Sequence, residues 1–172
     1  MSHRLPRRAL LIVDVEPAFL TPITKHIVPT LIDRIVHGRY GALVVAEYTD
    51  ATERKHATTK TQWERQYGAL HRGEETIPAL KNALEGRTVI RVVKSTRSLF
   101  GSDALLATKL RRRGIQEVHI AGLETHDCVL ATAFDAFDHG FRTFVLADVC
   151  ASKQVRLHRA AHAILRRAKL LR

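Results

Sequence analysis

Three residues of complementary chemistry, Asp14, Lys94 and Cys128, are candidates for a reactive site. Asp14 follows the apolar run LLIV, Lys94 follows RVV, and Cys128 closes the segment AGLETHDC. A deprotonated thiol is a nucleophile, a carboxylate can accept its proton, and an ammonium stabilises the thiolate. An acid, an ammonium and a thiol are the parts of a covalent hydrolase, so the three residues predict that chemistry.

Each of the three residues also has an ordinary structural interpretation. Most free cysteines are small buried hydrophobic residues, and a lysine at the start of a loop is commonly exposed. Cys128 falls where a helix is predicted to begin, and the partial positive charge of a helix N-terminus favours the thiolate. A lone buried carboxylate is costly, so Asp14 needs solvent or a cationic partner such as Lys94. Position alone leaves both interpretations of Cys128 open.

Apolar runs define the elements that must position these residues. Five runs have strand length and β-branched content, at residues 9–15, 42–48, 87–93, 117–123 and 142–148. Helical patterns alternate with them, at residues 24–37, 77–84, 102–113, 127–139 and 154–171. Four of the helical patterns end at a glycine, which predicts left-handed caps at Gly38, Gly86, Gly114 and Gly140.

The helix expected at residues 127–139 begins beside Cys128. Its apolar positions predict the face that it buries, which comprises Val129, Ala133, Phe134 and Phe137.

Strands that alternate with helices predict an α/β fold, because parallel neighbours need a crossover and the crossover is right-handed. We expect a three-layer α/β/α, Rossmann-like arrangement with a parallel sheet of five to six strands, in a single domain over residues 1–172. In such sheets ligands bind beyond the carboxyl ends of the strands. Asp14, Lys94 and Cys128 follow three different strands at that edge, so we expect them to meet.

Composition limits the class of protein. With 45% hydrophobic and 26% charged residues and no low-complexity tract, the chain is typical of a globular domain. Two cysteines cannot form a framework of several disulfides, and Asp14 and Glu16 interrupt the N-terminal apolar run too early for a signal or membrane segment. We therefore expect a cytoplasmic protein that is not associated with a membrane. The net charge is +11, but the arginines are scattered, so specific nucleic-acid binding is not expected.

Three blocks of the sequence resemble the isochorismatase-like cysteine hydrolases, a superfamily that includes nicotinamidase and N-carbamoylsarcosine amidohydrolase. The blocks are LLIVDVEPAFL, VVKSTRSLF and AGLETHDCVLATAFDAFDHGFRTFVLADVCAS. The resemblance extends from residue 9 to about residue 152, and the shared order and spacing of the blocks make it specific.

The resemblance implies a catalytic triad in which Cys128 is the nucleophile, Asp14 the general base, and Lys94 the cation that orders both. It also implies an oxyanion hole formed by the backbone N–H groups of Glu124 and Cys128, with a cis peptide bond between Leu123 and Glu124. The implied reaction cleaves a C–N bond of a small-molecule amide or ureido substrate through a thioester, without a cofactor. The implied assembly is a homo-oligomer, a dimer or a tetramer.

Two positions depart from the pattern of the superfamily. Glu16 stands where many relatives carry glutamine; in one pocket with Asp14 it would raise one of the two pKa values, but we favour a place past the strand end and an arginine partner. Nicotinamidases carry an Asp-x-His metal site after the second strand. Here Asp50 lacks a histidine two residues later and His56 is too distant, so we expect no metal, which counts against nicotinamidase itself.

Four aromatic residues are candidates for the walls of a substrate pocket: Phe19, Tyr48, Trp63 and Phe100. Aromatic residues at such places are as often plain core. Arg97 and Arg54 are candidates for binding a substrate carboxylate. Cys150 is expected to be structural, and whether the closing strand of longer relatives exists here stays open.

Two alternatives remain beside the hydrolase. A protein that keeps the fold and the triad without useful turnover would act as a binding or scaffold protein, and Glu16 fits that interpretation. A basic nucleic-acid-associated protein would use the charge alone.

Overall fold

A parallel five-stranded sheet forms the centre of the computed structural model, which describes residues 7–48 and 76–172. Its strands are β1 (Arg8–Val13), β2 (Ala42–Tyr48), β3 (Val89–Lys94), β4 (Glu117–Gly122) and β5 (Arg142–Cys150), in the order β3-β2-β1-β4-β5. All four pairings are parallel. The strand order reverses between β1 and β4, which is where sheets of this kind bind ligands.

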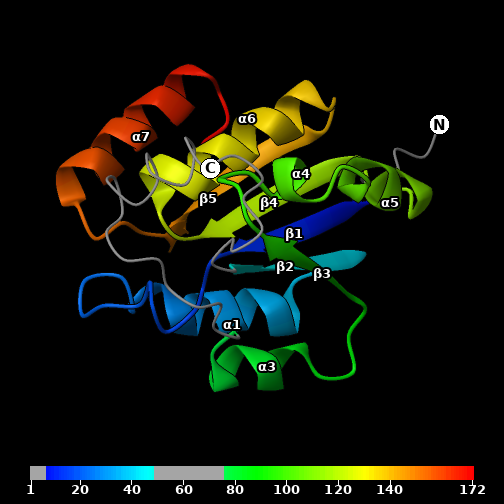
Figure 1. Ribbon diagram of the computed structural model, residues 1–172, viewed down its shortest axis with the longest axis horizontal. Coiled ribbons are helices and arrows are strands. Elements are labelled where there is room, and N and C mark those ends of the chain that lie inside the picture. Colours follow the sequence, from blue (N-terminus) through cyan, green and yellow to red (C-terminus); the bar gives the residue numbers. More distant parts are fainter. Residues whose placement is uncertain (1–6, 49–75) are drawn as a thin grey trace.

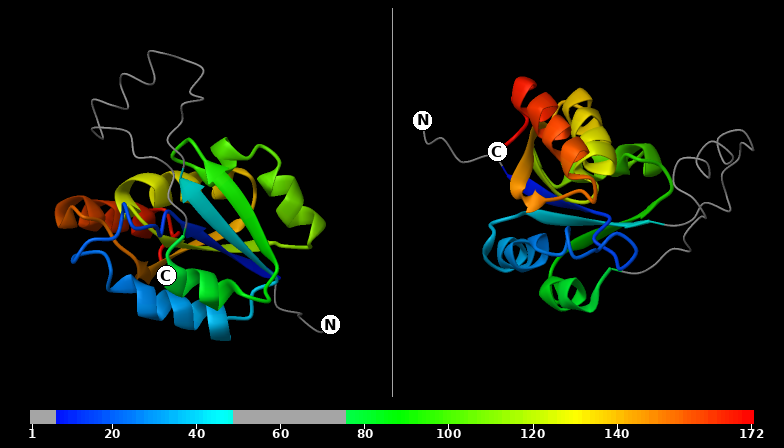
Figure 2. Two further views of the ribbon diagram at one scale, coloured as in Figure 1. Left: turned by 60° about the horizontal axis from the view of Figure 1, so that its bottom comes forward. Right: turned by 90° about the vertical axis from the view of Figure 1, so that its left-hand side faces the viewer.

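Helices cover both faces of the sheet (Figure 1 and Figure 2). Below it in Figure 1 lie α1 (Ile27–His37) and α3 (Pro78–Leu84). Above it lie α4 (Leu99–Ser102), α5 (Leu106–Arg112), α6 (Leu130–Asp138) and α7 (Val155–Arg167). The predicted three-layer α/β/α fold with a parallel sheet of five to six strands is confirmed.

The core lies on both sides of the sheet because its central strands are apolar throughout. Leu11 and Val13 of β1 belong to the cluster under α4, α5 and α6, whereas Leu10 and Ile12 belong to the cluster over α1 and α3. Neighbouring residues of a strand face opposite sides, so one short run serves both layers. Residues four apart form the buried stripe of α1, which comprises Ile27, Leu31 and Ile35.

The helix predicted at residues 154–171 is too long. α7 ends at Arg167, and Leu171 then forms a parallel bridge with Val145 of β5. The N–H of Arg172 donates to the carbonyl of Val145 at 2.9 Å, and the N–H of Ala147 donates to the carbonyl of Arg172 at 2.8 Å. The last residues therefore add a short extended segment beside β5.

The helix predicted at residues 102–113 is two helices. α4 begins earlier, at a cap where the Ser98 hydroxyl accepts from the N–H of Phe100, and it ends at Asp103 in an extended conformation. Three of the four predicted glycine caps are confirmed, because Gly86, Gly114 and Gly140 have φ of 69°, 69° and 81°. The prediction is wrong at Gly38, where φ is −68° and the chain leaves α1 extended.

The predicted buried face of the helix after Cys128 is half wrong. Val129 and Ala133 are buried, but Phe134 is 38% exposed and Phe137 is 56% exposed. A π-helical turn, η1 (Thr125–Val129), precedes α6, and the buried residues of α6 are Thr132, Ala133 and Ala136. Together with Val129 these residues form a regular helical stripe, but it contains small side chains where the prediction placed the two phenylalanines.

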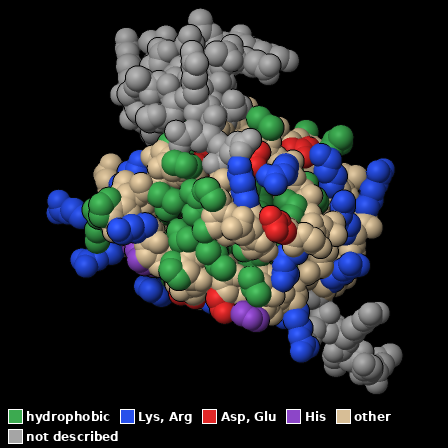
Figure 3. All heavy atoms as spheres, turned by 90° about the horizontal axis from the view of Figure 1, so that it is seen from below, with side chains coloured by type: hydrophobic (Ala, Val, Ile, Leu, Met, Phe, Trp, Pro, Cys, Tyr) green, Lys and Arg blue, Asp and Glu red, His purple; other side chains and the backbone are tan. Residues whose placement is uncertain are grey.

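The surface over α1 and α3 has apolar side chains in its middle, with Lys and Arg side chains spread around them (Figure 3). Among the described residues, the helices lack the length and apolar character that crossing a membrane requires.

Candidate active site

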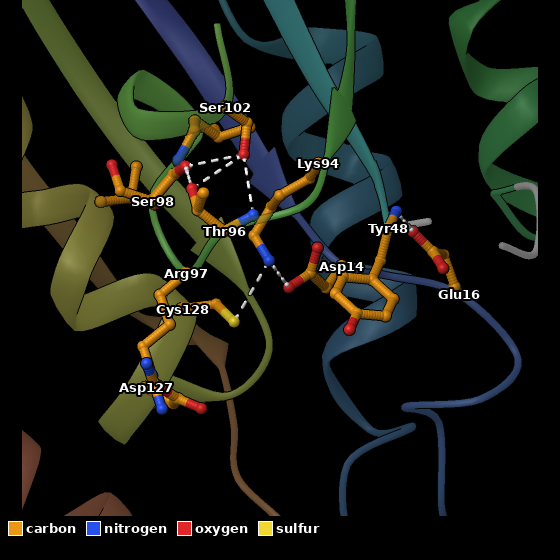
Figure 4. A network of polar contacts seen from close by, with 12 residues as sticks. Asp14, Glu16, Tyr48, Lys94, Thr96, Arg97, Ser98, Ser102, Asp127 and Cys128 are labelled. Atoms are coloured by element: carbon orange, nitrogen blue, oxygen red, sulfur yellow. Dashed lines mark hydrogen bonds and ion pairs between the residues drawn. The ribbon is translucent and has the colours of Figure 1, made fainter. Parts of the chain in front are cut away.

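Side chains from the ends of three strands meet at one edge of the sheet (Figure 4). Asp14 directly follows β1, Lys94 is the last residue of β3, and Cys128 lies in η1, just after β4. The Nζ atom of Lys94 is 2.9 Å from Oδ2 of Asp14 and 3.3 Å from Sγ of Cys128. Asp14 and Lys94 are fully buried and Cys128 is nearly so. One ammonium thus contacts both a carboxylate and a thiol away from bulk water.

The register of the sheet brings these groups to the same level. Val13 pairs with Gly122, and Lys94 pairs with Tyr48. Gly122 has φ of 124°, and a Cβ at this position would lie 2.0 Å from the carbonyl oxygen of Val13. Only glycine therefore allows β4 to approach β1 so closely, immediately before the chain turns toward Cys128.

The backbone at Asp14 has a conformation that few residues other than glycine adopt, with φ of 50°. Aspartate is among the residues that tolerate the left-handed region best. Such an outlier at the end of a core strand is typical of a position held by its surroundings for a functional reason.

Two hydrogen bonds hold the segment before Cys128 against the residues that follow β5. The N–H of Thr125 donates to the carbonyl of Ala151 at 3.0 Å, and the N–H of Lys153 donates to Oε2 of Glu124 at 2.8 Å. The Leu123–Glu124 peptide bond is cis, as the resemblance implies. Among the described residues, no acceptor pairs with the backbone N–H of Glu124, so this donor is available to a ligand.

Burial and mutual contact set the charges of the three groups. Burial alone lowers the pKa of Lys94, but Asp14 and Cys128 outweigh it and raise this pKa above its ordinary value. Burial raises the pKa of Asp14, and Lys94 opposes that rise only in part. Burial, together with the Asp14 carboxylate, raises the pKa of Cys128 well above its ordinary value. Lys94 is therefore held in its charged form, whereas burial favours the protonated forms of Asp14 and Cys128.

The sequence-based expectation of a thiol biased toward thiolate is therefore wrong for the resting site. The partial charge at a helix terminus is a smaller effect than the removal of a thiolate from water next to a carboxylate. The thiol instead lies beside a base that can take its proton. Oδ2 of Asp14 contacts the Lys94 ammonium, and among the described residues no hydrogen-bond partner is recorded for Oδ1, which is therefore the oxygen available as an acceptor.

Glu16 is not at a surface position with an arginine partner, which corrects the expectation for this residue. It is buried, and its Oε1 atom accepts a hydrogen bond from the backbone N–H of Tyr48 at 2.5 Å. Burial is the largest cause that raises the pKa of Glu16 to about 8. Among the described residues, no arginine forms an ion pair with this carboxyl.

Two of the four aromatic candidates lie beside the triad. The Tyr48 ring centroid is 5.1 Å from Nζ of Lys94, and Phe19 meets that ring edge to face at 5.8 Å. Phe100 instead belongs to the core, where it stacks with Phe141 and His139, at the far end of α6 from Cys128. Trp63 lies outside the described residues.

Two of the remaining candidates, Arg97 and Cys150, lie among the described residues. Nε of Arg97 is 2.6 Å from Oδ1 of Asp127, the residue before Cys128, so Arg97 holds the start of η1. Arg54, Asp50 and His56 lie outside the described residues. Cys150 is buried, with its thiol 3.6 Å from the carbonyl of Ile120, and burial raises its pKa to about 12, as befits a structural cysteine.

Sequence reasoning missed the loop that follows Lys94. The hydroxyl of Ser102 accepts from the N–H groups of Ser95 and Thr96, both at 3.2 Å, and Thr96 donates to the carbonyl of Ser98 at 2.8 Å (Figure 4). These contacts fix the chain directly after the ammonium. The hydroxyl-rich segment STRS was the available signal, because serine and threonine commonly bond to nearby backbone groups.

A metal site has no support in the part of the chain that the structure describes, since no group of three or more His, Cys, Asp or Glu side chains there is placed to hold an ion.

Comparison with known proteins gives a matching family model and several related proteins. The isochorismatase domain model matches residues 8–170. The uncharacterised isochorismatase family protein PncA of Bacillus subtilis is 34% identical over 128 residues, 69% of this chain and 65% of that protein. Maleamate amidohydrolase of Pseudomonas putida is 28% identical over 95 residues, 48% of this chain and 45% of that protein. The aligned segments thus span less than two thirds of these curated relatives.

Among solved structures, the nicotinamidase/pyrazinamidase PncA from Bacillus subtilis superposes with a TM-score of 0.74 at 27% identity, and covers 93% of this chain and 94% of that chain.

Proposed function

The chain belongs to the isochorismatase family of hydrolases, and on that premise we propose that it is a cysteine amidohydrolase that cleaves a C–N bond of a small amide or ureido compound. The observation that carries the proposal is the position of the Lys94 ammonium, 2.9 Å from the Asp14 carboxylate and 3.3 Å from the Cys128 thiol. Nucleophile, base and stabilising cation are then within direct reach of one another, as covalent catalysis requires.

In the first half of the reaction, Asp14 takes the thiol proton while the sulfur of Cys128 attacks the carbonyl carbon of the substrate. Lys94 stabilises the negative charge as it moves from the carboxylate to the sulfur. The carbonyl oxygen becomes an oxyanion, which the backbone N–H groups of Glu124 and Cys128 receive. The unpaired N–H of Glu124 supports this role, and one such donor contributes about 3 kcal/mol in comparable enzymes.

In the second half, the C–N bond breaks as Asp14 returns the proton to the departing nitrogen. Ammonia or an amine leaves, and the acyl group remains on the sulfur as a thioester. Asp14 then takes a proton from a water molecule that attacks the thioester, and this proton returns to the sulfur when the acid departs. The three side chains are regenerated in their starting states.

Small amides related to the substrates of the relatives provide the test. Purified protein is incubated with nicotinamide, pyrazinamide, maleamate and ureido compounds, and released ammonia is measured for wild type, Cys128→Ala and Cys150→Ala. We expect turnover with wild type and with Cys150→Ala, and a loss of more than about a thousandfold with Cys128→Ala. Hydroxylamine should intercept the thioester as a hydroxamate. Turnover that survives Cys128→Ala excludes this sulfur as the nucleophile.

Membership of this family also suggests where the enzyme works and how it assembles. We propose that it works in the cytoplasm as a homo-oligomer, a dimer or a tetramer, without a cofactor or a metal. The exposed Phe134 and Phe137 of α6 support self-association, because large apolar side chains are favourable at interfaces. Light scattering coupled to size-exclusion chromatography gives the mass directly, and a monomer at micromolar concentration would refute the assembly.

A further inference from the structure

Glu16 lies two residues after Asp14 and has no part in the proposed reaction. Its Oε1 atom accepts the N–H of Tyr48 at 2.5 Å, and its backbone carbonyl accepts the N–H groups of Phe19 and Leu20, both at 3.1 Å. Glu16 thus joins the loop after β1 to the last residue of β2, with its carboxyl directed at the backbone of Tyr48 (Figure 4).

Tyr48 connects this contact to the site. It pairs with Lys94 in the register of β2 and β3, and its ring centroid lies 5.1 Å from the Lys94 ammonium. An aromatic ring at that distance attracts a cation through its π-electrons. A side chain that fixes the backbone of Tyr48 therefore also fixes one neighbour of the ammonium on which the reaction depends.

We propose that Glu16 is a positioning residue for the proposed amide hydrolysis: its buried carboxyl, in the uncharged form, holds the end of β2 and keeps Tyr48 beside the Lys94 ammonium. The inference rests on the proposed function and adds to it a residue that never touches the substrate.

The charges around Glu16 are the reason for the uncharged form. Asp14 and Lys94 face it from the ends of β1 and β3, but the ammonium already contacts both Asp14 and Cys128. Glu47, the neighbouring carboxylate on β2, pairs with Arg91. Burial raises the pKa of Glu16 to about 8; the Tyr48 N–H and Lys94 oppose the rise, whereas Asp14 and Glu47 add to it.

Ionisation of Glu16 then has a direct consequence for the reaction. A second carboxylate charge beside Asp14 disfavours both the Cys128 thiolate and the oxyanion, and one ammonium cannot compensate it. We therefore expect kcat/KM of the wild type to fall about tenfold between pH 7 and pH 9, as a group with a pKa of about 8 loses its proton.

The pH profiles of two matched variants test this expectation. Glu16→Gln keeps an oxygen that can accept the Tyr48 N–H and cannot ionise, so its rate at pH 7 should stay within about threefold of wild type while the fall above pH 8 disappears. Glu47→Gln removes a charge from the adjacent residue of β2 and should keep the fall. Identical profiles for wild type and Glu16→Gln, or the loss of the fall in Glu47→Gln alone, overturn the proposal.

Glu16→Leu tests the hydrogen bond itself, because it fills the space without an acceptor. We expect kcat to fall at least tenfold at every pH with the fold retained by circular dichroism. A folded Glu16→Leu protein with wild-type kcat overturns the positioning role. If this variant does not fold, the comparison of Glu16→Gln with Glu47→Gln still decides.

A second measurement needs no turnover and so separates this inference from the proposed function. A carboxyl whose folded pKa is raised stabilises the fold fully below its ordinary pKa of 4.5, and that stability is lost as pH rises toward about 8. Glu16→Gln and wild type should therefore melt alike near pH 4.5, and Glu16→Gln should melt several degrees higher at pH 8.5. Equal melting temperatures at pH 8.5 refute an uncharged Glu16 even when amides are cleaved.

Discussion

The contact between Lys94 and Asp14 predicts a large coupling energy that can be measured without a substrate. Their charged atoms are 2.9 Å apart and both side chains are fully buried. At an effective dielectric constant of ~20, two unit charges at this separation attract by about 6 kcal/mol. Removing one partner leaves the other charge buried alone, which costs about 3–5 kcal/mol in comparable proteins.

A double-mutant cycle measures this coupling. Urea unfolding of wild type, Asp14→Asn, Lys94→Met and the double variant gives the four free energies of unfolding. We expect each single change to cost about 3–5 kcal/mol and the double variant to recover most of that loss, because no buried charge remains. All three variants should be inactive.

A surface ion pair provides the matched control for the cycle. Arg34 and Asp148 are 2.6 Å apart, but their side chains are 34% and 48% exposed. The corresponding cycle with Arg34→Met and Asp148→Asn should give a coupling energy below about 1 kcal/mol. A coupling energy for Asp14 and Lys94 as small as that of the surface pair would refute the buried arrangement on which the reaction depends.

The pH dependence of Lys94→Met has a defined sign. Without the ammonium, burial raises the pKa of Asp14 further, so the carboxyl is neutral in the folded state and ionised in the unfolded state at neutral pH. The cost of Lys94→Met should therefore grow as pH rises above about 4, and it should be smaller at pH 5 than at pH 8.

Two further predictions concern the backbone and the thiol. Gly122→Ala should lower the free energy of unfolding in urea by more than about 3 kcal/mol, because its Cβ would meet the carbonyl of Val13. Gly114→Ala, with φ of 69° and open space around it, should lower it by only about 1–2 kcal/mol. Equal changes for the two variants would contradict the close approach of β4 to β1. Asp14→Asn removes a charge that raises the pKa of Cys128, so iodoacetamide should alkylate Cys128 faster than in wild type at pH 7.5, while Cys150 stays slow in both; an unchanged rate would place the carboxylate away from the thiol.

Much of the fold could be predicted from the sequence because the strands are buried on both faces. Runs such as LLIV before Asp14 are long enough and apolar enough to be strands, and their alternation with helices leaves few topologies. The edge where Asp14, Lys94 and Cys128 meet could also be predicted, because the carboxyl ends of parallel strands lie at one edge of the sheet. The strand order could not be predicted, because it depends on which apolar faces fit together in three dimensions.

The errors have local causes that a residue pattern does not contain. Phe134 and Phe137 face outward because the side of α6 that packs on the sheet consists of Thr132, Ala133 and Ala136. Thr132 takes a core position instead, where its hydroxyl accepts the N–H of Leu99 at 3.3 Å. The pKa of Cys128 and the position of Glu16 depend on burial and on neighbours from other strands, so neither could be predicted from the sequence.

Burial raises the pKa of both Asp14 and Cys128, yet this does not oppose the proposed reaction. The free energy of proton transfer between two groups depends on the difference between their pKa values, and burial shifts both in the same direction. Lys94 contacts both groups, so it stabilises whichever of them carries the negative charge. The proton can then pass from sulfur to carboxylate without any change in the net charge of the buried site. An extra charge that acts on the two partners unequally would disturb this balance, and for that reason the protonation state of Glu16 matters to a reaction in which it takes no direct part.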